Sequence, residues 1–114
     1  MRRMSFGLTT RQMLERSKTV TRRIGWWNLR KGEELLAVEK CMGLKKGEHQ
    51  KVLGRIRVTG IVLGPLGGVT DEDAVREGFP HLTGAEFVEF FCKSMRCKPE
   101  QVVARIEFEH LETP

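Results

Sequence analysis

The sequence lacks any apolar run long enough to cross a membrane. A transmembrane helix needs about 18 or more consecutive apolar residues, and the mean hydropathy of this chain is −0.35. The first residues, MRRMSF, are basic, but polar residues rather than an apolar segment follow them, so they do not have the pattern of a signal peptide. We therefore expect a cytoplasmic protein with no membrane partner.

Cysteine is also scarce, which argues against metal-binding and disulfide-rich classes of protein. The chain has three cysteines, an odd number, and they lack the paired C-x-x-C spacing of zinc sites. None of the three histidines stands at ligand spacing from a cysteine or a carboxylate. We expect no metal, no cofactor, and reduced thiols that lie partly in the core. These cysteines are Cys41, Cys92 and Cys97, and the histidines are His49, His81 and His110.

Charge is unevenly distributed along a chain whose 114 residues fit one domain, residues 1–114. A domain of this size buries about two-thirds of its unfolded surface and needs no disulfides. Residues 1–57 carry a net charge of +10, whereas residues 58–114 carry −5. This asymmetry favours a basic face directed at a polyanion. The alternative is that folding mixes the two halves and solvates both.

The first forty residues predict strands around one short helix. Residues 4–8 alternate between apolar and polar or small side chains, the period of a half-buried strand. Thr9, with Gln12 three positions later, forms a capping signature for a helix. The β-branched segment 18–23 and the apolar segment 33–40 each favour a strand.

The longest strand candidate, residues 52–63, follows a predicted loop at 42–48 that contains lysine and glycine. Its alternation shifts phase at Gly60, which predicts a β-bulge or a barrel corner. The predicted inward-facing residues are Val52, Gly54, Ile56, Val58, Ile61 and Leu63.

Two capped helices and a last strand complete the prediction. Thr70 with Asp73 opens a helix that Gly78 ends, and Thr83 with Glu86 forms a second capping box. The second helix carries an apolar stripe that indicates core packing rather than a cofactor site: Phe87, Phe90, Phe91 and Met95. A final strand covers residues 102–109. The order β-α-β-β-β-α-α-β predicts an α+β fold, a mixed sheet curled into a small barrel with short helices at its mouth.

Cations and aromatic residues gather after the predicted short helix. Arg22 and Arg23 offer planar forks for phosphate, and Trp26 and Trp27 offer stacking platforms for bases, a combination that suits single-stranded nucleic acid or a nucleotide. The alternative is a core tryptophan and a partly exposed neighbour.

A second basic patch centres on Lys45 and Lys46, which glycines flank. Its alternative is a solvated hairpin tip. Further cations of this patch are Lys40, Lys51, Arg55 and Arg57.

Three stretches together carry a family resemblance: LERSKTVTRR, LRKGEELLAV and DAVREGFPHLTGAEFVEFF. In order and spacing they resemble the ASCH domain, from Met4 to Phe108. The resemblance implies a PUA-like β-barrel with a cleft and a role in RNA binding. The chain is also similar to small bacterial acetylcytidine amidohydrolases of that superfamily, and this similarity implies catalytic roles for Lys18, Thr21 and Glu77.

The sequence departs from the hydrolase pattern in two features that bear on the choice of substrate. The chain has Arg22 and Arg23 in succession where those hydrolases have a single arginine after an apolar residue, and the Trp26–Trp27 pair is not part of their pattern. Some ASCH proteins are ribonucleases, so the superfamily alone does not define the chemistry.

Two functional hypotheses follow. The first is a cleft that binds RNA, another single-stranded nucleic acid or a nucleoside. The second is a hydrolase of RNA or of an acylated nucleoside, in which a desolvated Lys18 has a lowered pKa and activates the Thr21 hydroxyl. A structural Lys18–Glu77 ion pair is the alternative to catalysis, and a weaker third hypothesis is a protein partner for the acidic half. Neither leading hypothesis fixes the oligomeric state or the choice between RNA and DNA.

Overall fold

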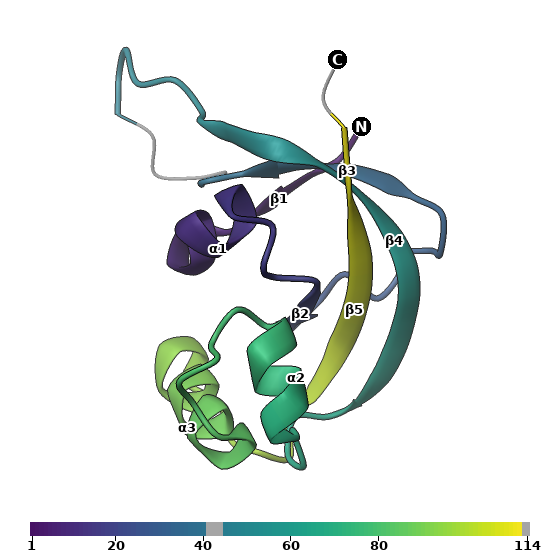
Figure 1. The fold of residues 1–114 in the computed structure, drawn as a ribbon, viewed down its shortest axis with the longest axis vertical. Helices are drawn as coiled ribbons and strands as arrows, with labels where there is room; N and C mark the ends of the chain where they lie inside the picture. The colour runs from purple at the N-terminus through teal and green to yellow at the C-terminus, as the bar shows by residue number, and fades with distance from the viewer. Residues whose placement is uncertain (41–44, 113–114) are drawn as a thin grey trace.

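A curved five-stranded sheet organises the computed structural model, which describes residues 1–40 and 45–112 (Figure 1). Its strand order is β1-β3-β4-β5-β2; β1 runs parallel to β3, and the other neighbours are antiparallel. The strands are β1 Arg3–Ser5, β2 Val20–Arg23, β3 Glu34–Val38, β4 Val52–Pro65 and β5 Val102–Leu111. The predicted α+β class and mixed sheet are confirmed. Within the described residues β1 and β2 are the two edge strands and do not pair with each other, so the sheet is open and not a closed barrel.

The two long strands give the sheet its bend. β4 and β5 pair from Arg55 opposite Leu111 to Pro65 opposite Val102, with a register shift between Val58 and Gly60. The predicted irregularity at Gly60 is thus confirmed. Since a bulge bends a strand and increases its twist, it accounts for the way both strands curve together in Figure 1.

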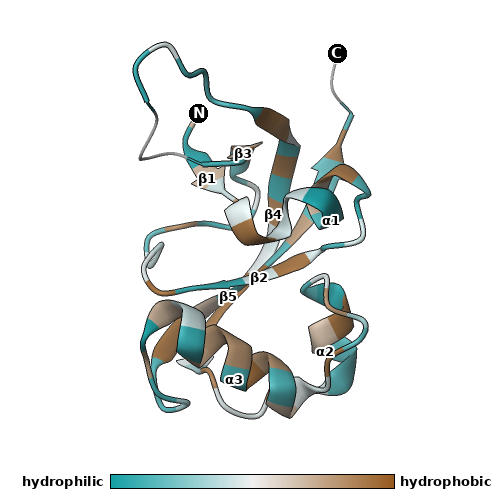
Figure 2. Cartoon of the chain, turned by 90° about the vertical axis from the view of Figure 1, so that its left-hand side faces the viewer, coloured by the Kyte–Doolittle hydropathy of each residue, from teal (hydrophilic) through white to brown (hydrophobic). Residues whose placement is uncertain are grey.

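The helices lie on the concave side of the sheet. The 3-10 turn η1 (Gly7–Thr9) and helix α1 (Thr10–Leu14) lie near one end, and α2 (Asp71–Arg76) and α3 (Gly84–Met95) lie near the other (Figure 1). Seen from that side, β2 passes between the two groups (Figure 2). The loop predicted at 42–48 is described only from residue 45 onward; positions 42–44, like Cys41, lie outside the described residues.

Two of the three predicted caps are present. The Thr70 hydroxyl accepts from the Asp73 backbone N–H at 3.1 Å, and Thr83 and Glu86 form the reciprocal capping box. The prediction for Thr9 is wrong, because its side chain makes no capping bond. The 3-10 turn runs directly into α1, so no extended residue precedes the helix.

Two apolar clusters form the core. The larger packs against the middle of β4, so Val52 and Leu63, near the ends of that strand, are about half exposed and were wrongly predicted to face inward. Cys92 and Cys97 are free thiols that pack partly buried against the smaller cluster. The larger cluster contains Met4, Phe6, Met13, Leu29, Leu35, Ala37, Ile56, Val58, Ala104, Ile106 and Phe108. The smaller contains Leu66, Ala74, Phe87, Phe91 and Val103.

We predict that Gly78→Ala destabilises the protein by about 1–3 kcal/mol. Gly78 has φ +100°, and a Cβ there would lie 2.8 Å from Cγ of Gln12. Gly64→Ala is the matched control, because a Cβ at Gly64 meets nothing within 4 Å. The measurement is the free energy of unfolding in urea. Equal stability of the two variants would contradict the prediction.

Candidate functional site

A cavity of about 310 Å³ lies between η1 and α3. The strand β2 forms part of its wall, consistent with the position of that strand between the two helix groups in Figure 2. Both polar and aromatic side chains line it. The polar ones are Ser5, Thr9, Lys18, Thr21, Arg22, Arg23, Glu39, Lys40, Glu77 and Ser94, and the aromatic ones are Phe6, Phe79, Phe87, Phe90 and Phe91.

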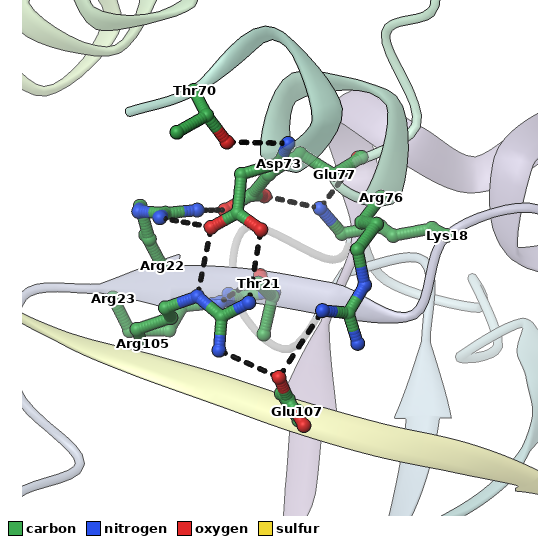
Figure 3. Close-up of polar contacts among 10 residues, drawn as sticks. All are labelled: Lys18, Thr21, Arg22, Arg23, Thr70, Asp73, Arg76, Glu77, Arg105 and Glu107. Atoms are coloured by element: carbon green, nitrogen blue, oxygen red, sulfur yellow. Dashed lines mark hydrogen bonds and ion pairs between the residues drawn. The ribbon is translucent and has the colours of Figure 1, made fainter. Parts of the chain in front are cut away.

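The centre of the site is a buried ion pair between Lys18 and Glu77. Nζ of Lys18 lies 2.7 Å from Oε1 of Glu77 and donates a second bond to the Glu77 backbone oxygen at 2.8 Å. The two residues are only 3% and 2% exposed. They are 59 positions apart in sequence, and they join the segment before β2 to the turn after α2 (Figure 3).

Arg22 adds a second cation to the same carboxylate. Its Nη1 lies 2.9 Å from Oε2 of Glu77, and its Nη2 lies 2.5 Å from Oδ2 of Asp73. Arg105 on β5 binds both carboxylate oxygens of Asp73, at 2.8 and 2.9 Å. Arg105 also contacts Glu107 at 2.7 Å. A continuous charged network therefore connects α2 with β2 and β5 (Figure 3).

Burial and neighbouring charges shift pKa values in this network, among them those of Lys18 and Asp73. Burial lowers the pKa of Lys18; the Glu77 carboxylate opposes that fall, whereas Arg23 and Arg22 add to it. The hydrogen bonds from Arg105, together with Arg22, hold the pKa of Asp73 well below its usual range despite partial burial. The two kinds of cation therefore differ: arginine keeps its proton in proteins, whereas burial makes the Lys18 amine easier to deprotonate.

Thr21 lies buried in the same cavity, on β2. Nε of Arg23 donates to Oγ1 of Thr21 at 3.1 Å, and the Arg23 guanidinium lies 4.7 Å from the Phe6 ring centre. Lys18 precedes the first residue of β2, so the alternation of side chains along the strand does not force it to the face opposite Thr21. The chain can therefore direct both side chains into one cavity.

Two hydrogen bonds fix the backbone of Lys18. The backbone N–H of Lys18 donates to the Gln12 oxygen at 3.4 Å, and Nε2 of His110 lies 2.7 Å from the Lys18 oxygen. The Gln12 side chain in turn donates to the Gly78 oxygen at 3.1 Å. Hydrogen bonds therefore fix the backbone at Lys18 and at Gly78, the residue after Glu77.

Four phenylalanines form the opposite wall. The rings of Phe79, Phe87, Phe90 and Phe91 contact one another in tilted geometry, with centroids 5.1 to 6.4 Å apart. Phe87 and Phe91 are buried, which confirms the predicted core packing for these two residues of the α3 stripe, whereas Phe90 is partly buried and Met95 is 48% exposed, so the prediction is wrong for Met95. The same stripe also faces the cavity, a second role that its spacing did not indicate.

The structure separates the residues predicted to bind nucleic acid. Arg22 and Arg23 line the cavity, but Trp26, Trp27 and the Lys45–Lys46 pair are not among its lining residues. The Trp26 ring is partly buried beneath the Arg2 guanidinium, at 5.1 Å, and Trp27 is 48% exposed. Lys45 and Lys46 are exposed to solvent. By contrast, the three residues predicted for catalysis, Lys18, Thr21 and Glu77, all line the cavity.

Sequence analysis missed the outer members of the charged network. Asp73 was predicted only as the partner of Thr70 in a helix cap, and Arg105 was not singled out within the predicted last strand. Their pairing depends on the packing of α2 against β5, which local patterns do not reveal.

Residues 1–40 and 45–112 contain no cluster of three or more His, Cys, Asp and Glu side chains that could hold a metal ion. None of the helices in these residues combines the length and apolar character that a membrane-spanning helix needs.

The fold is similar to solved structures, although no family model and no curated protein matches the sequence. One similar structure is the ASCH domain from Lactobacillus crispatus JV V101, with a TM-score of 0.65 and 14% identity over 95% of this chain and 77% of that one. Another is protein EF3133 from Enterococcus faecalis V583, of the family designated DUF984, with a TM-score of 0.63 and 18% identity over 96% and 79%. The chain therefore has an ASCH-like fold.

We predict that Asp73→Asn lowers the free energy of unfolding by about 1–3 kcal/mol at pH 7, because charge-assisted hydrogen bonds are lost. The carboxylate is ionised in the unfolded chain only above its ordinary pKa of 3.8, and folding lowers that pKa. Its stabilising contribution is therefore complete above pH 3.8 and is lost as the pH falls through the lower folded value.

The difference in the free energy of unfolding between wild type and Asp73→Asn, measured in urea, should accordingly become smaller below pH 3.8. Glu72→Gln, an exposed neighbour on α2, is the control and should change stability little. A difference that stays constant from pH 7 to pH 2 would rule out the Asp73 ion pairs as its source.

Proposed function

We propose that this protein is a hydrolase that removes an acyl group from a nucleoside-sized substrate, such as an acetylated cytidine. The observation that carries the proposal is the position of Lys18, Thr21 and Glu77 around one cavity, with the lysine buried and its pKa lowered. A titratable group perturbed in this way, inside a cleft, is a frequent mark of a catalytic site.

The size and lining of the cavity support a small planar substrate. Its volume of about 310 Å³ lies at the lower end of the range for small-molecule sites. The wall of Phe79, Phe87, Phe90 and Phe91 offers aromatic faces and edges to a heterocyclic ring. A stretch of RNA exceeds this volume, and a single nucleoside suits it.

The hydrogen bonds of Lys18 suit a general base. A neutral amine has two N–H groups and one lone pair, and Glu77 provides two acceptors, its Oε1 and its backbone oxygen. With both N–H groups used, the lone pair can accept a proton, and we assign the Thr21 hydroxyl, which lines the same cavity, as its source. Nε of Arg23 donates to Oγ1 of Thr21 at 3.1 Å and so helps to orient the hydroxyl.

The proposed reaction has two halves. Lys18 takes the Thr21 hydroxyl proton as Oγ1 bonds to the acyl carbon; the bond from that carbon to the nucleoside nitrogen breaks, and the nitrogen leaves with the proton from Lys18. Water then gives a proton to Lys18 and bonds to the acyl carbon, and the ester to Thr21 breaks as Oγ1 regains a proton. The products are the nucleoside amine and a carboxylic acid.

The test is release of acetate from acetylcytidine by the purified protein. We predict that Lys18→Met and Thr21→Val each reduce kcat by at least about 100-fold, since they remove the base and the nucleophile. The matched controls are Lys45→Met, on the exposed loop, and Thr19→Val, two positions before Thr21 and outside the cavity lining. Full activity in either site variant, with its fold intact, would contradict the assignment.

A second candidate function is binding of single-stranded RNA or of a nucleotide without turnover. The specific observation that favours it is the exposed Trp27, which lies in the same loop as the exposed Arg30 and Lys31, with Lys45 and Lys46 also exposed. Exposed tryptophan next to cations suits base stacking and phosphate contact.

For this second function we predict that RNA affinity falls steeply with salt, with a slope of about −0.7 per phosphate contacted. Trp27→Ala should weaken binding, and Arg30→Ala with Lys31→Ala should flatten the slope. The measurement is tryptophan fluorescence during titration with an oligonucleotide at several salt concentrations. An affinity that does not depend on salt would exclude this mode of binding.

A further inference from the structure

Arg22 holds an unusual position beside the buried ion pair. It contacts the carboxylate oxygen of Glu77 that Lys18 does not use, and its other nitrogen contacts Asp73 (Figure 3). Its side chain is 8% exposed. Two buried cations therefore share one carboxylate, and the second cation has a carboxylate of its own.

The groups around Lys18 come from four elements. The turn after α2 contributes the Glu77 carboxylate and backbone oxygen, and β2 contributes the charges of Arg22 and Arg23. His110 of β5 and Gln12 of α1 contact only the Lys18 backbone. Glu77 is the one anion within hydrogen-bonding distance of the amine among the described residues.

The two cations differ in how readily they lose a proton. An arginine side chain keeps its proton in proteins, whereas a lysine amine loses its proton readily when it is buried. Glu77 keeps a permanent counter-charge in Arg22 whether or not Lys18 is protonated. The cost of a neutral lysine, an uncompensated buried carboxylate, is thereby removed.

We propose that Arg22 is a positioning residue that gives Glu77 a permanent counter-charge, so that the buried Lys18 amine releases its proton more easily than it would beside a carboxylate with no second cation. Asp73, itself held by Arg105, fixes Arg22 in place and limits how strongly its charge acts on Lys18. The consequence for catalysis rests on the proposed hydrolase function, but the charge state of Lys18 does not depend on it.

The experiment follows the titration of Lys18 by NMR of the ¹³Cε groups in protein labelled at lysine. The Lys18 signal is the one missing from Lys18→Met. Arg22→Met removes a positive charge near the amine, so the titration midpoint of Lys18 should move to higher pH. Asp73→Asn removes the negative charge that offsets Arg22, so the midpoint should move to lower pH.

Opposite shifts distinguish charge from packing. If Arg22 and Asp73 only hold the site together, both variants admit water and both midpoints rise toward the ordinary value for lysine; that result would overturn the proposal. Arg22→Lys keeps the positive charge and should leave the midpoint lower than Arg22→Met does. Glu107→Gln, which also loses a contact to Arg105 but none to Arg22, should leave the midpoint unchanged.

Hydrolysis adds a separate readout on the same variants. If the proposed function also holds, the midpoint of the pH profile of kcat should follow the NMR midpoint in Arg22→Met, with at least a tenfold loss of kcat at pH 7. Opposite NMR shifts without any hydrolysis would sustain the role of Arg22 and reject the hydrolase. Hydrolysis together with an unchanged Lys18 midpoint in Arg22→Met would support the hydrolase and reject the role of Arg22.

Discussion

The buried pair of Lys18 and Glu77 is the interaction on which the rest of the site depends. Two charges are taken out of water, which is tolerable only with close geometry and further hydrogen bonds. Glu77 has both: Lys18 on one oxygen and Arg22 on the other. Since Arg22 continues to Asp73, and Asp73 to Arg105 on β5, the same network holds α2 against β2 and β5. Lys18 and Glu77, two residues of the proposed catalytic site, therefore also belong to the network that stabilises the fold.

The cavity exists because two parts of the chain approach it from opposite sides. The turn η1 and the end of β1 supply Phe6 and its neighbours, while α3 supplies Phe87, Phe90 and Phe91. Between them β2 presents a cationic and hydroxyl-bearing wall. An aromatic wall together with a polar one suits a ligand with a planar ring and a polar substituent, and the acylated nucleoside that we propose as substrate has both.

The sequence was informative wherever a local pattern determines the structure. The order of elements, the caps at Thr70 and Thr83 and the irregularity at Gly60 all follow from short-range rules, and each is present. The capping role of Thr9 failed because the 3-10 turn before α1 is not visible in the pattern. Asp73 and Arg105 were missed because their contact is set by the packing of a helix on a distant strand.

The central claim is that the cavity around Lys18, Thr21 and Glu77 is where a small ligand binds. Chemical-shift mapping with cytidine tests this claim directly, on ¹⁵N-labelled protein with methyl and aromatic signals assigned. The account predicts that the largest changes fall on β2 from Thr21 to Arg23 and on the phenylalanines of α3. Changes confined to Trp27 and the loop around Lys45, with the cavity signals unmoved, would contradict it.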